Sequence, residues 1–188
     1  MSEHYFSVQH CLSISVIPME PDFVLPELAN LETEIPEAFK IANTIVHLDL
    51  SNTRSLRNIN EDFSTLVEVI NQQAKKINLL MAYILLKEED ELHHHFSTSF
   101  GGSEVTFFSD LPLDMGQMLR LKLFLREEAS AVYCYGKVIR IEQQHEKSCY
   151  TAEYTLIRDD DRELLIRACL NQQSKQLRER AAQKYNQQ

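Results

Sequence analysis

The chain has 188 residues, of which 44% are hydrophobic and 25% are charged, and its formal net charge at pH 7 is −9. A chain of this length can bury one hydrophobic core, so we expect a single domain over residues 1–188. The negative charge repels phosphate backbones, and no basic stretch interleaved with aromatic residues offsets it, so we expect no nucleic acid partner.

The cysteines and the apolar segments together favour a cytoplasmic protein. The four cysteines have no C-x-x-C spacing and do not resemble a dense disulfide framework, which is typical of thiols in a reducing compartment. They are Cys11, Cys134, Cys149 and Cys169. No run of about 18 apolar residues occurs, so we also expect no membrane insertion.

The N-terminal region predicts one strand, an irregular segment and a short helix. Apolar and polar residues alternate up to Pro18, as in a half-buried strand. Residues 20–36 contain three prolines among acidic residues, which argues against regular structure. Pro36 followed by Glu37 then suits the first turn of a helix.

The most regular pattern in the sequence begins at Ile59. Its steps alternate between four and three residues, the spacing that keeps one seam of a helix facing a partner. The seam consists of Ile59, Phe63, Leu66, Ile70, Gln73, Ile77, Leu80 and Ile84. A helix of four heptads is about 40 Å long, more than a small sheet can cover. We therefore expect a long heptad-repeat helix that projects; the alternative is a stripe packed on the protein's own sheet.

The positions beside this seam favour more than two helices. A two-stranded coil usually carries charge there, whereas these positions include Val67, Val69, Ala74, Met81 and Tyr83. Gln73 lies inside the seam, where a hydrogen-bonded amide would fix the register and the number of helices; the alternative is that Gln73 is partly exposed and has no role. We expect a homo-oligomer, a tetramer, with a dimer as the alternative.

Three consecutive histidines, His93–His95, follow the predicted helix close to several glutamates. Zinc ligands need a suitable spacing and supporting hydrogen bonds, which a plain run does not guarantee. We interpret the run as a polar strand whose histidines alternate between faces, and we predict no metal site. A zinc site is the weaker alternative.

From Val105 onward the pattern predicts an antiparallel meander and a final helix. In "MLRLKLFLR" the leucines alternate with other residues, and "AVYCYGKVIRI" and "CYTAEYTLI" predict two further strands. Asp159–Asp161 suit a first helical turn, and Leu164, Leu165, Ala168 and Cys169 can dock on the sheet. The expected class is α+β: a small antiparallel β-barrel from strands at about 4–18 and 93–157, a helical insertion at about 36–88 and a C-terminal helix at about 160–183.

The glycine turn followed by "LPLDMGQMLRLKL", "YGKVIRI" and "YTAEYTLI" resembles the PilZ domain, the cyclic di-GMP receptor barrel of bacterial signalling. One family motif is Asp or Asn, any residue, Ser, two residues and Gly. Residues 97–102, "STSFGG", keep Ser99 and Gly102 and place Ser97 at the acidic or amide position. The resemblance covers about residues 96–175, and the inserted helix is similar to the atypical tetrameric PilZ subfamily. It implies a PilZ-like barrel with a ligand-facing turn formed by Ser97, Ser99, Gly101 and Gly102.

The resemblance also implies two arginines, four residues apart and upstream of the turn, that hold the ligand's phosphates. No such pair precedes Ser97, because Arg54 and Arg57 are three apart. Arg158 and Arg162 have the spacing, but they enclose three aspartates and follow the last strand, so we interpret that match as accidental. Strong binding of cyclic di-GMP is therefore not expected. The alternative is an atypical receptor in which Arg54, Arg57 or Arg140 supplies charge from another subunit.

No enzymatic activity is expected, since the sequence contains no Ser/His/Asp grouping, paired-carboxylate motif, P-loop or dinucleotide fingerprint. The predicted function is that of a non-enzymatic PilZ-like signalling or adaptor protein of the cyclic di-GMP system. It would have no cofactor and would act through oligomerisation and a signalling protein that the sequence does not identify. The alternative is a functional atypical cyclic di-GMP receptor.

Overall fold

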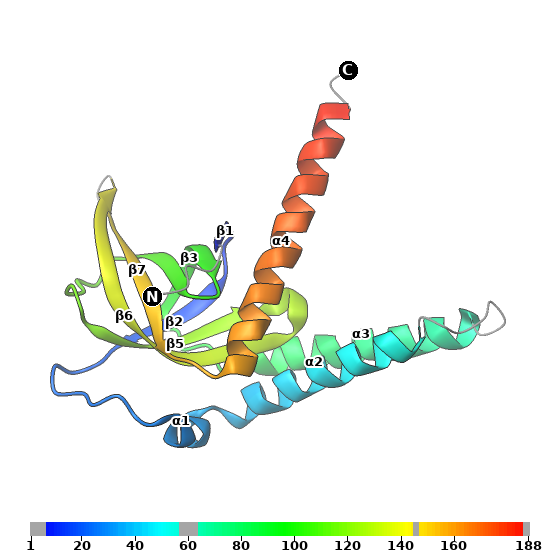
Figure 1. The fold of residues 1–188 in the computed structure, drawn as a ribbon, viewed down its shortest axis with the longest axis horizontal. Helices are drawn as coiled ribbons and strands as arrows, with labels where there is room; N and C mark the ends of the chain where they lie inside the picture. Colours follow the sequence, from blue (N-terminus) through cyan, green and yellow to red (C-terminus); the bar gives the residue numbers. More distant parts are fainter. Residues whose placement is uncertain (1–6, 57–63, 145–146, 186–188) are drawn as a thin grey trace.

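The computed structural model describes residues 7–56, 64–144 and 147–185 (Figure 1). Its strands are β1 (Ser7–Gln9), β2 (Ser13–Pro18), β3 (His94–Gly101), β4 (Glu104–Ser109), β5 (Met118–Leu125), β6 (Ser130–Gln144) and β7 (Lys147–Leu156). They form an antiparallel sheet in the order β1-β3-β2-β5-β6-β7-β4, and a further pairing of β3 with β4 closes it. Strands β2–β7 therefore form a six-stranded barrel, with β1 as a short addition along β3.

The interior of the barrel is filled by alternating apolar residues of its strands. Leu119, Leu121, Leu123 and Leu125 of β5 are fully buried, as their alternation in the sequence predicted. Each such side chain contributes about 1.5–3 kcal/mol on burial. Gly136 of β6 allows close packing here, because a Cβ atom at this position would lie 2.8 Å from the Leu121 side chain.

Four α-helices complete the fold: α1 (Leu28–Glu34), α2 (Glu37–Leu56), α3 (Ser64–Leu86) and α4 (Asp159–Tyr185). The first half of α4 packs on the barrel, where Leu164, Leu165, Ala168 and Cys169 join the barrel core. Its second half extends away from the barrel (Figure 1). The acidic first turn and the docking residues of this helix agree with the sequence-based prediction.

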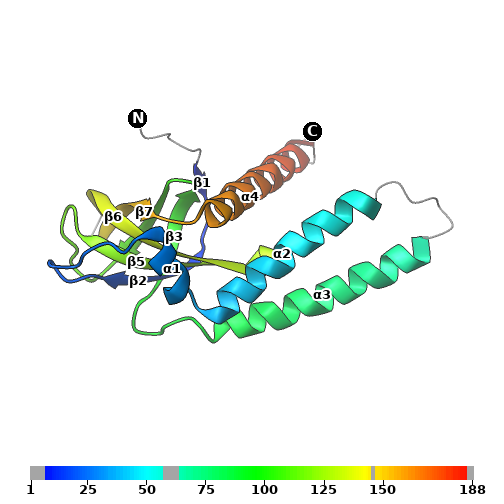
Figure 2. The ribbon, with the colours of Figure 1, turned by 60° about the horizontal axis from the view of Figure 1, so that its bottom comes forward.

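Helices α2 and α3 form an antiparallel hairpin that extends from the side of the barrel (Figure 2). Phe39, Ala42, Met81 and Leu85 at its root share a buried cluster with residues on the outer face of the barrel, including Tyr133. The 23 residues of α3 span about 35 Å at 1.5 Å per residue. Because only the root meets the barrel, much of the hairpin projects.

The short helix α1 is fastened to the outside of the barrel close to this root. Leu31 is fully buried, and the Glu34 carboxylate accepts hydrogen bonds from the hydroxyl groups of Tyr133 (3.2 Å) and Tyr135 (2.6 Å). These contacts give the acidic segment after β2 a fixed path along the barrel.

The predicted α+β class, with a PilZ-like barrel, a long helix in an insertion and a C-terminal helix, is confirmed. Three predictions of single elements are wrong. The predicted N-terminal strand is in fact two strands, β1 and β2. The segment that was expected to be irregular contains helix α1, between Pro26 and Pro36. The helix after Pro36, expected to be short, is the 20-residue α2. None of the helices within the described ranges has the length and apolarity needed to cross a bilayer.

Candidate functional site

Ser97, at the acidic position of the family motif, lies on β3 and is buried opposite the interruption between β1 and β2. Its Oγ accepts a hydrogen bond from the Leu12 N–H at 2.9 Å and donates one to the His10 carbonyl at 2.9 Å. Its own N–H donates to the Leu12 carbonyl. The hydroxyl group therefore replaces the ladder hydrogen bonds that the broken strand lacks, and only 3% of Ser97 is exposed.

The other motif residues lie along the end of β3 and its turn into β4. Ser99 is half-buried and pairs with Thr106, whereas Gly101 and Gly102 are buried. The side chain of Arg162, in the first turns of α4, donates to the Gly102 carbonyl oxygen. The docking of α4 thus brings Arg162, whose spacing from Arg158 we interpreted as accidental, back to the glycine turn.

Arg140, the remaining predicted ligand residue, lies on β6 away from this turn. The register aligns it with Thr151 of β7, then with Thr106 of β4, and then with Ser99. Arg140 and Ser99 are therefore three strand spacings apart, which corresponds to about 14 Å along the sheet. The guanidinium of Arg140 lies 3.8 Å from the Glu142 carboxylate, with more than half of both side chains exposed. Within one copy, Arg140 and the motif serine therefore lie on the same sheet without touching.

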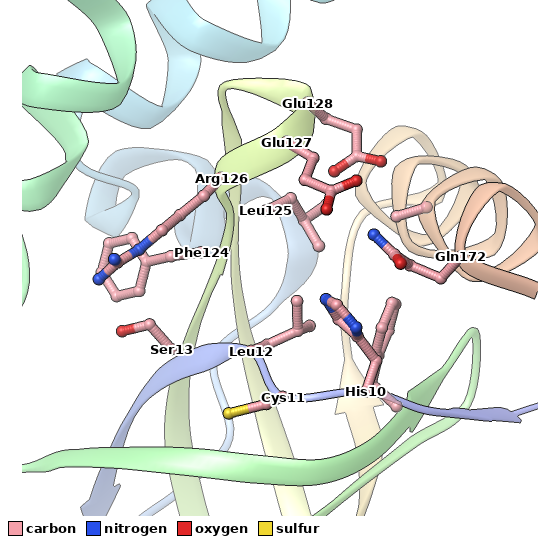
Figure 3. Close-up of a pocket in the computed structure, with 12 residues that line it drawn as sticks. His10, Cys11, Leu12, Ser13, Phe124, Leu125, Arg126, Glu127, Glu128 and Gln172 are labelled. Atoms are coloured by element: carbon pink, nitrogen blue, oxygen red, sulfur yellow. The ribbon is translucent and has the colours of Figure 1, made fainter. Parts of the chain in front are cut away.

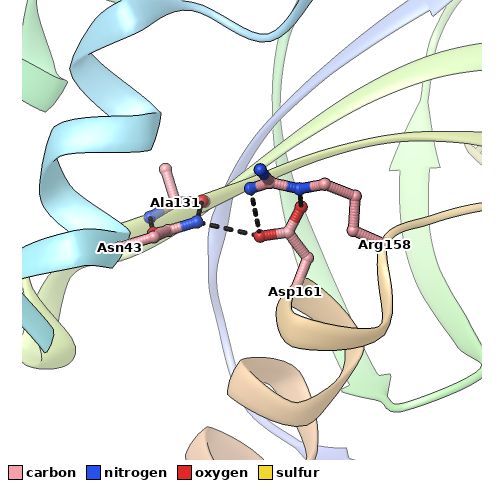
Figure 4. A network of polar contacts seen from close by, with 4 residues as sticks. All are labelled: Asn43, Ala131, Arg158 and Asp161. Carbon is pink, nitrogen blue, oxygen red and sulfur yellow. Dashed lines mark hydrogen bonds and ion pairs between the residues drawn. The ribbon is translucent and has the colours of Figure 1, made fainter. Parts of the chain in front are cut away.

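Arg158, the other member of the pair four residues apart, belongs to a buried network between α2, β6 and α4 (Figure 4). Its guanidinium donates two hydrogen bonds to the carboxylate of Asp161, at 2.8 and 2.9 Å. Asn43 of α2 donates to the same carboxylate at 2.8 Å and to the Ala131 carbonyl at 3.1 Å. Burial raises the pKa of Asp161, and the hydrogen bonds from Arg158 and Asn43 oppose this. The network joins the hairpin to the barrel and to α4.

The predicted seam lies on an exposed face of α3. The exposed fractions are 54% for Leu66, 41% for Ile70, 46% for Ile77, 65% for Leu80 and 43% for Ile84. Gln73 is exposed as well. The first two seam positions, Ile59 and Phe63, lie outside the described residues. Within one copy, α3 therefore presents these aliphatic side chains to solvent rather than to the barrel.

A different stripe of α3 faces its own chain. Met81 and Leu85 are buried, and Val67, Ala74 and Asn78 are half-buried. Several of these are positions that the sequence pattern placed beside the seam. The wide apolar face of α3 thus has two parts, one that packs within the copy and one that stays exposed.

A small cavity lies where α4 leaves the barrel (Figure 3). His10, Glu127, Glu128 and Gln172 are among its polar lining residues, and its volume is about 60 Å³. A hydrogen bond from Lys175 lowers the pKa of Glu127, whereas burial raises that of Glu128. This volume holds a few water molecules at most, so the cavity is too small for a dinucleotide.

His94 and His95 begin β3, and His93 directly precedes this strand. His93 Nδ1 lies 2.7 Å from Asp90 Oδ2, and His94 Nε2 lies 2.9 Å from Ser13 Oγ. Burial lowers the pKa of His95. No group of three or more His, Cys, Asp or Glu side chains in the described parts of the chain is arranged to hold a metal ion.

Comparisons with known proteins agree with this fold. A family model for the PilZ domain matches residues 79–171. A solved protein from Xanthomonas campestris, described as a new tetrameric PilZ domain self-assembled via a helical bundle, has a TM-score of 0.56 and 13% identity. That comparison covers 93% of this chain and 91% of the other.

A second solved structure is the Bacillus subtilis inhibitor of motility, MotI/DgrA, with a TM-score of 0.50 and 14% identity. It covers 93% of this chain, which spans 53% of the length of that protein. At such identities the likeness is one of fold. Comparison with curated protein sequences finds no match.

The family match includes β3–β7 and the first half of α4, and the structure adds β2, from before the hairpin, to the same closed barrel. Sequence match and topology therefore agree that the chain contains a PilZ domain.

Proposed function

We propose that this chain is a non-enzymatic adaptor of the cyclic di-GMP system that binds the dinucleotide weakly or not at all and acts through oligomerisation and a protein partner. The observation that carries the proposal is the exposed seam of α3, in which five large aliphatic side chains are each 41–65% exposed. Apolar surface of this kind on a projecting helix favours association with further helices.

The proposed assembly is a tetramer built around α3. The Xanthomonas protein with a similar fold is described as a tetramer formed through a helical bundle. Here the inner stripe of α3 is already covered within the copy, so the outer seam is the face available for a bundle. Gln73 would then lie inside the interface, where an amide can set register and helix number.

Weak binding of cyclic di-GMP is supported by the state of the motif residues. Both hydrogen-bonding functions of the Ser97 hydroxyl group are used to hold the strand interruption. Arg140 lies across the sheet from Ser99 and close to Glu142. Burial raises the pKa values of the Cys134 and Cys169 thiols, so neither of these two thiols suits a nucleophilic role.

An atypical cyclic di-GMP receptor is the second candidate, and one contact favours it. Arg162 reaches the Gly102 carbonyl, so a guanidinium group does lie at the glycine turn. A ligand phosphate that replaced this carbonyl could bind the Arg162 guanidinium beside Gly102.

Isothermal titration calorimetry with cyclic di-GMP separates the two candidates. We expect no binding or only weak binding, because the paired arginines that would hold two phosphates are missing upstream of the turn. A submicromolar dissociation constant that survives moderate salt would contradict the adaptor proposal. In that case four single variants, titrated separately, identify the arginine that holds the ligand: Arg54→Ala, Arg57→Ala, Arg140→Ala and Arg162→Ala.

A further inference from the structure

A groove lies between two segments of the barrel, residues 19–23 after β2 and residues 114–118, which lead into β5. Its volume is about 240 Å³, and its apolar lining includes Met19, Phe23, Met115 and Met118. The carboxylate residues Glu20 and Asp114 line the same groove. We propose that this groove binds a basic segment of a partner protein that inserts one apolar side chain. The inference rests on the proposed adaptor function, because it gives the chemistry of the partner.

The groove is formed in advance by main-chain hydrogen bonds. The Met19 N–H donates to the Met118 carbonyl at 2.9 Å and ties the two loops together. The Gly116 N–H donates to the Val138 carbonyl at 2.8 Å, in a turn where Gly116 has φ +84°, a conformation that favours glycine. A preformed groove loses little entropy on binding.

The floor of the groove can accept an apolar anchor. The ring of Phe23 packs against that of Tyr135, with 5.1 Å between their centroids, which fixes the aromatic wall. Met115 is 62% exposed, and methionine side chains adapt to partners of varied shape. Val24 and Leu111, in the same two loop regions, are 83% and 47% exposed. The apolar surface therefore extends beyond the groove itself.

The charge around the groove selects a basic partner. Residues 19–34 and 110–117 contain no Lys, Arg or His, and their acidic residues are Glu20, Asp22, Glu27, Glu32, Glu34, Asp110 and Asp114. The nearby cations include Lys147, which pairs with Asp110 at 3.5 Å, Lys137, which lies beside Gly116, and Arg120, which is aligned with Tyr135 on the neighbouring strand. Among the described residues, no ion pair within 4.0 Å involves Glu20 or Asp114. Lys or Arg side chains on either side of an apolar anchor would complement these carboxylates.

The methionines provide a direct test, because three of the five in the chain line the groove. The full-length protein, labelled with ¹³C at the methionine methyl groups, is titrated with a synthetic peptide of about twelve residues that has lysines around a central leucine. We expect the methyl signals of Met19, Met115 and Met118 to shift, and that of Met81, buried at the hairpin root, to stay. A peptide with serine in place of the leucine, and one with glutamates in place of the lysines, should bind much more weakly.

Matched variants distinguish the groove from general attraction to an acidic protein. Two variants should each weaken peptide binding by roughly threefold to tenfold. One is the double variant Glu20→Gln with Asp114→Asn, and the other is the single variant Met115→Ser. Glu142→Gln removes an exposed carboxylate elsewhere on the barrel and should leave binding unchanged. Equal weakening by Glu142→Gln, or a shift of Met81 without the groove methionines, would refute the inference.

Two further outcomes show whether a negative result refutes the groove inference or the proposed adaptor function. If the groove signals shift when the unliganded protein is concentrated, a second copy occupies the groove and the partner-segment inference is wrong. If the peptide does not bind while calorimetry shows no cyclic di-GMP binding and light scattering shows an oligomer, only the groove is refuted. Tight cyclic di-GMP binding would refute the adaptor function instead.

Discussion

The hydroxyl group of Ser97 in β3 is hydrogen-bonded to His10 and Leu12, which lie between β1 and β2, where the strand ladder is interrupted. Its removal in Ser97→Ala leaves the Leu12 N–H and the His10 carbonyl without this partner. An unsatisfied buried polar group costs about 1–3 kcal/mol, so we expect the free energy of unfolding to fall by that amount. Urea denaturation followed by circular dichroism measures the change.

Ser99→Ala is the matched control for this prediction. Ser99 is half-buried, and none of the hydrogen bonds seen across the strand interruption involves its hydroxyl group. We expect its unfolding free energy to stay within about 0.5 kcal/mol of the wild type. A similar loss in both variants would show that the strand interruption does not depend on the Ser97 hydroxyl group.

At the scale of elements, the joint formed by Asn43, Arg158 and Asp161 connects the hairpin, the barrel and α4. The Arg158 side chain is half-buried. Asp161→Ala would leave its guanidinium without the carboxylate partner and would also remove a hydrogen-bond partner of Asn43. Breaking a buried pair in this way costs about 3–5 kcal/mol. We therefore expect a loss of stability of that size in denaturant unfolding.

The double variant Asp161→Ala with Arg158→Ala tests the cause of this loss. It should recover part of the stability, because no uncompensated cation remains. Asp159→Ala, at an exposed position in the same first turn, should cost less than about 1 kcal/mol through the helix dipole. If the Asp159 variant is as unstable as the Asp161 variant, the effect belongs to the helix terminus and not to the joint.

Elements with a regular period could be predicted from the sequence, and elements defined by distant contacts could not. The leucines of β5 alternate along one strand, so their burial follows from local pattern alone. The short helix α1 has no comparable period and depends on Leu31 and Glu34 meeting the barrel. The seam on α3 was visible as a heptad pattern, but which part of its apolar face packs within the copy depends on where α2 lies.

The candidate site shows the same limit. The motif residues around Ser99 could be found from spacing, because the glycine turn is local in sequence. The role of Ser97 could not, since its partners His10 and Leu12 are 87 and 85 positions away. The contact of Arg162 with Gly102 likewise arises from the docking of α4, which spacing alone does not reveal.

For the whole molecule, the two proposed surfaces lie far from each other. In both views helices α2 and α3 extend to one side, whereas the loop after β2, around residues 19–27, lies on the other side of the barrel (Figures 1 and 2). A bundle formed through α3 would therefore leave the groove of each copy open. Several grooves on one assembly would raise the apparent affinity for a partner that carries more than one basic segment.

The oligomeric state of the protein depends on the exposed seam of α3. We expect light scattering at micromolar concentration to give the mass of a tetramer, with a dimer as the alternative. Ile77→Glu or Ile70→Glu should dissociate it, because a carboxylate in a dry interface costs several kcal/mol. Lys75→Glu places the same carboxylate at an exposed position on another face of α3 and should leave the mass unchanged. A wild-type monomer would contradict the proposal, because the seam would then stay in water without a partner.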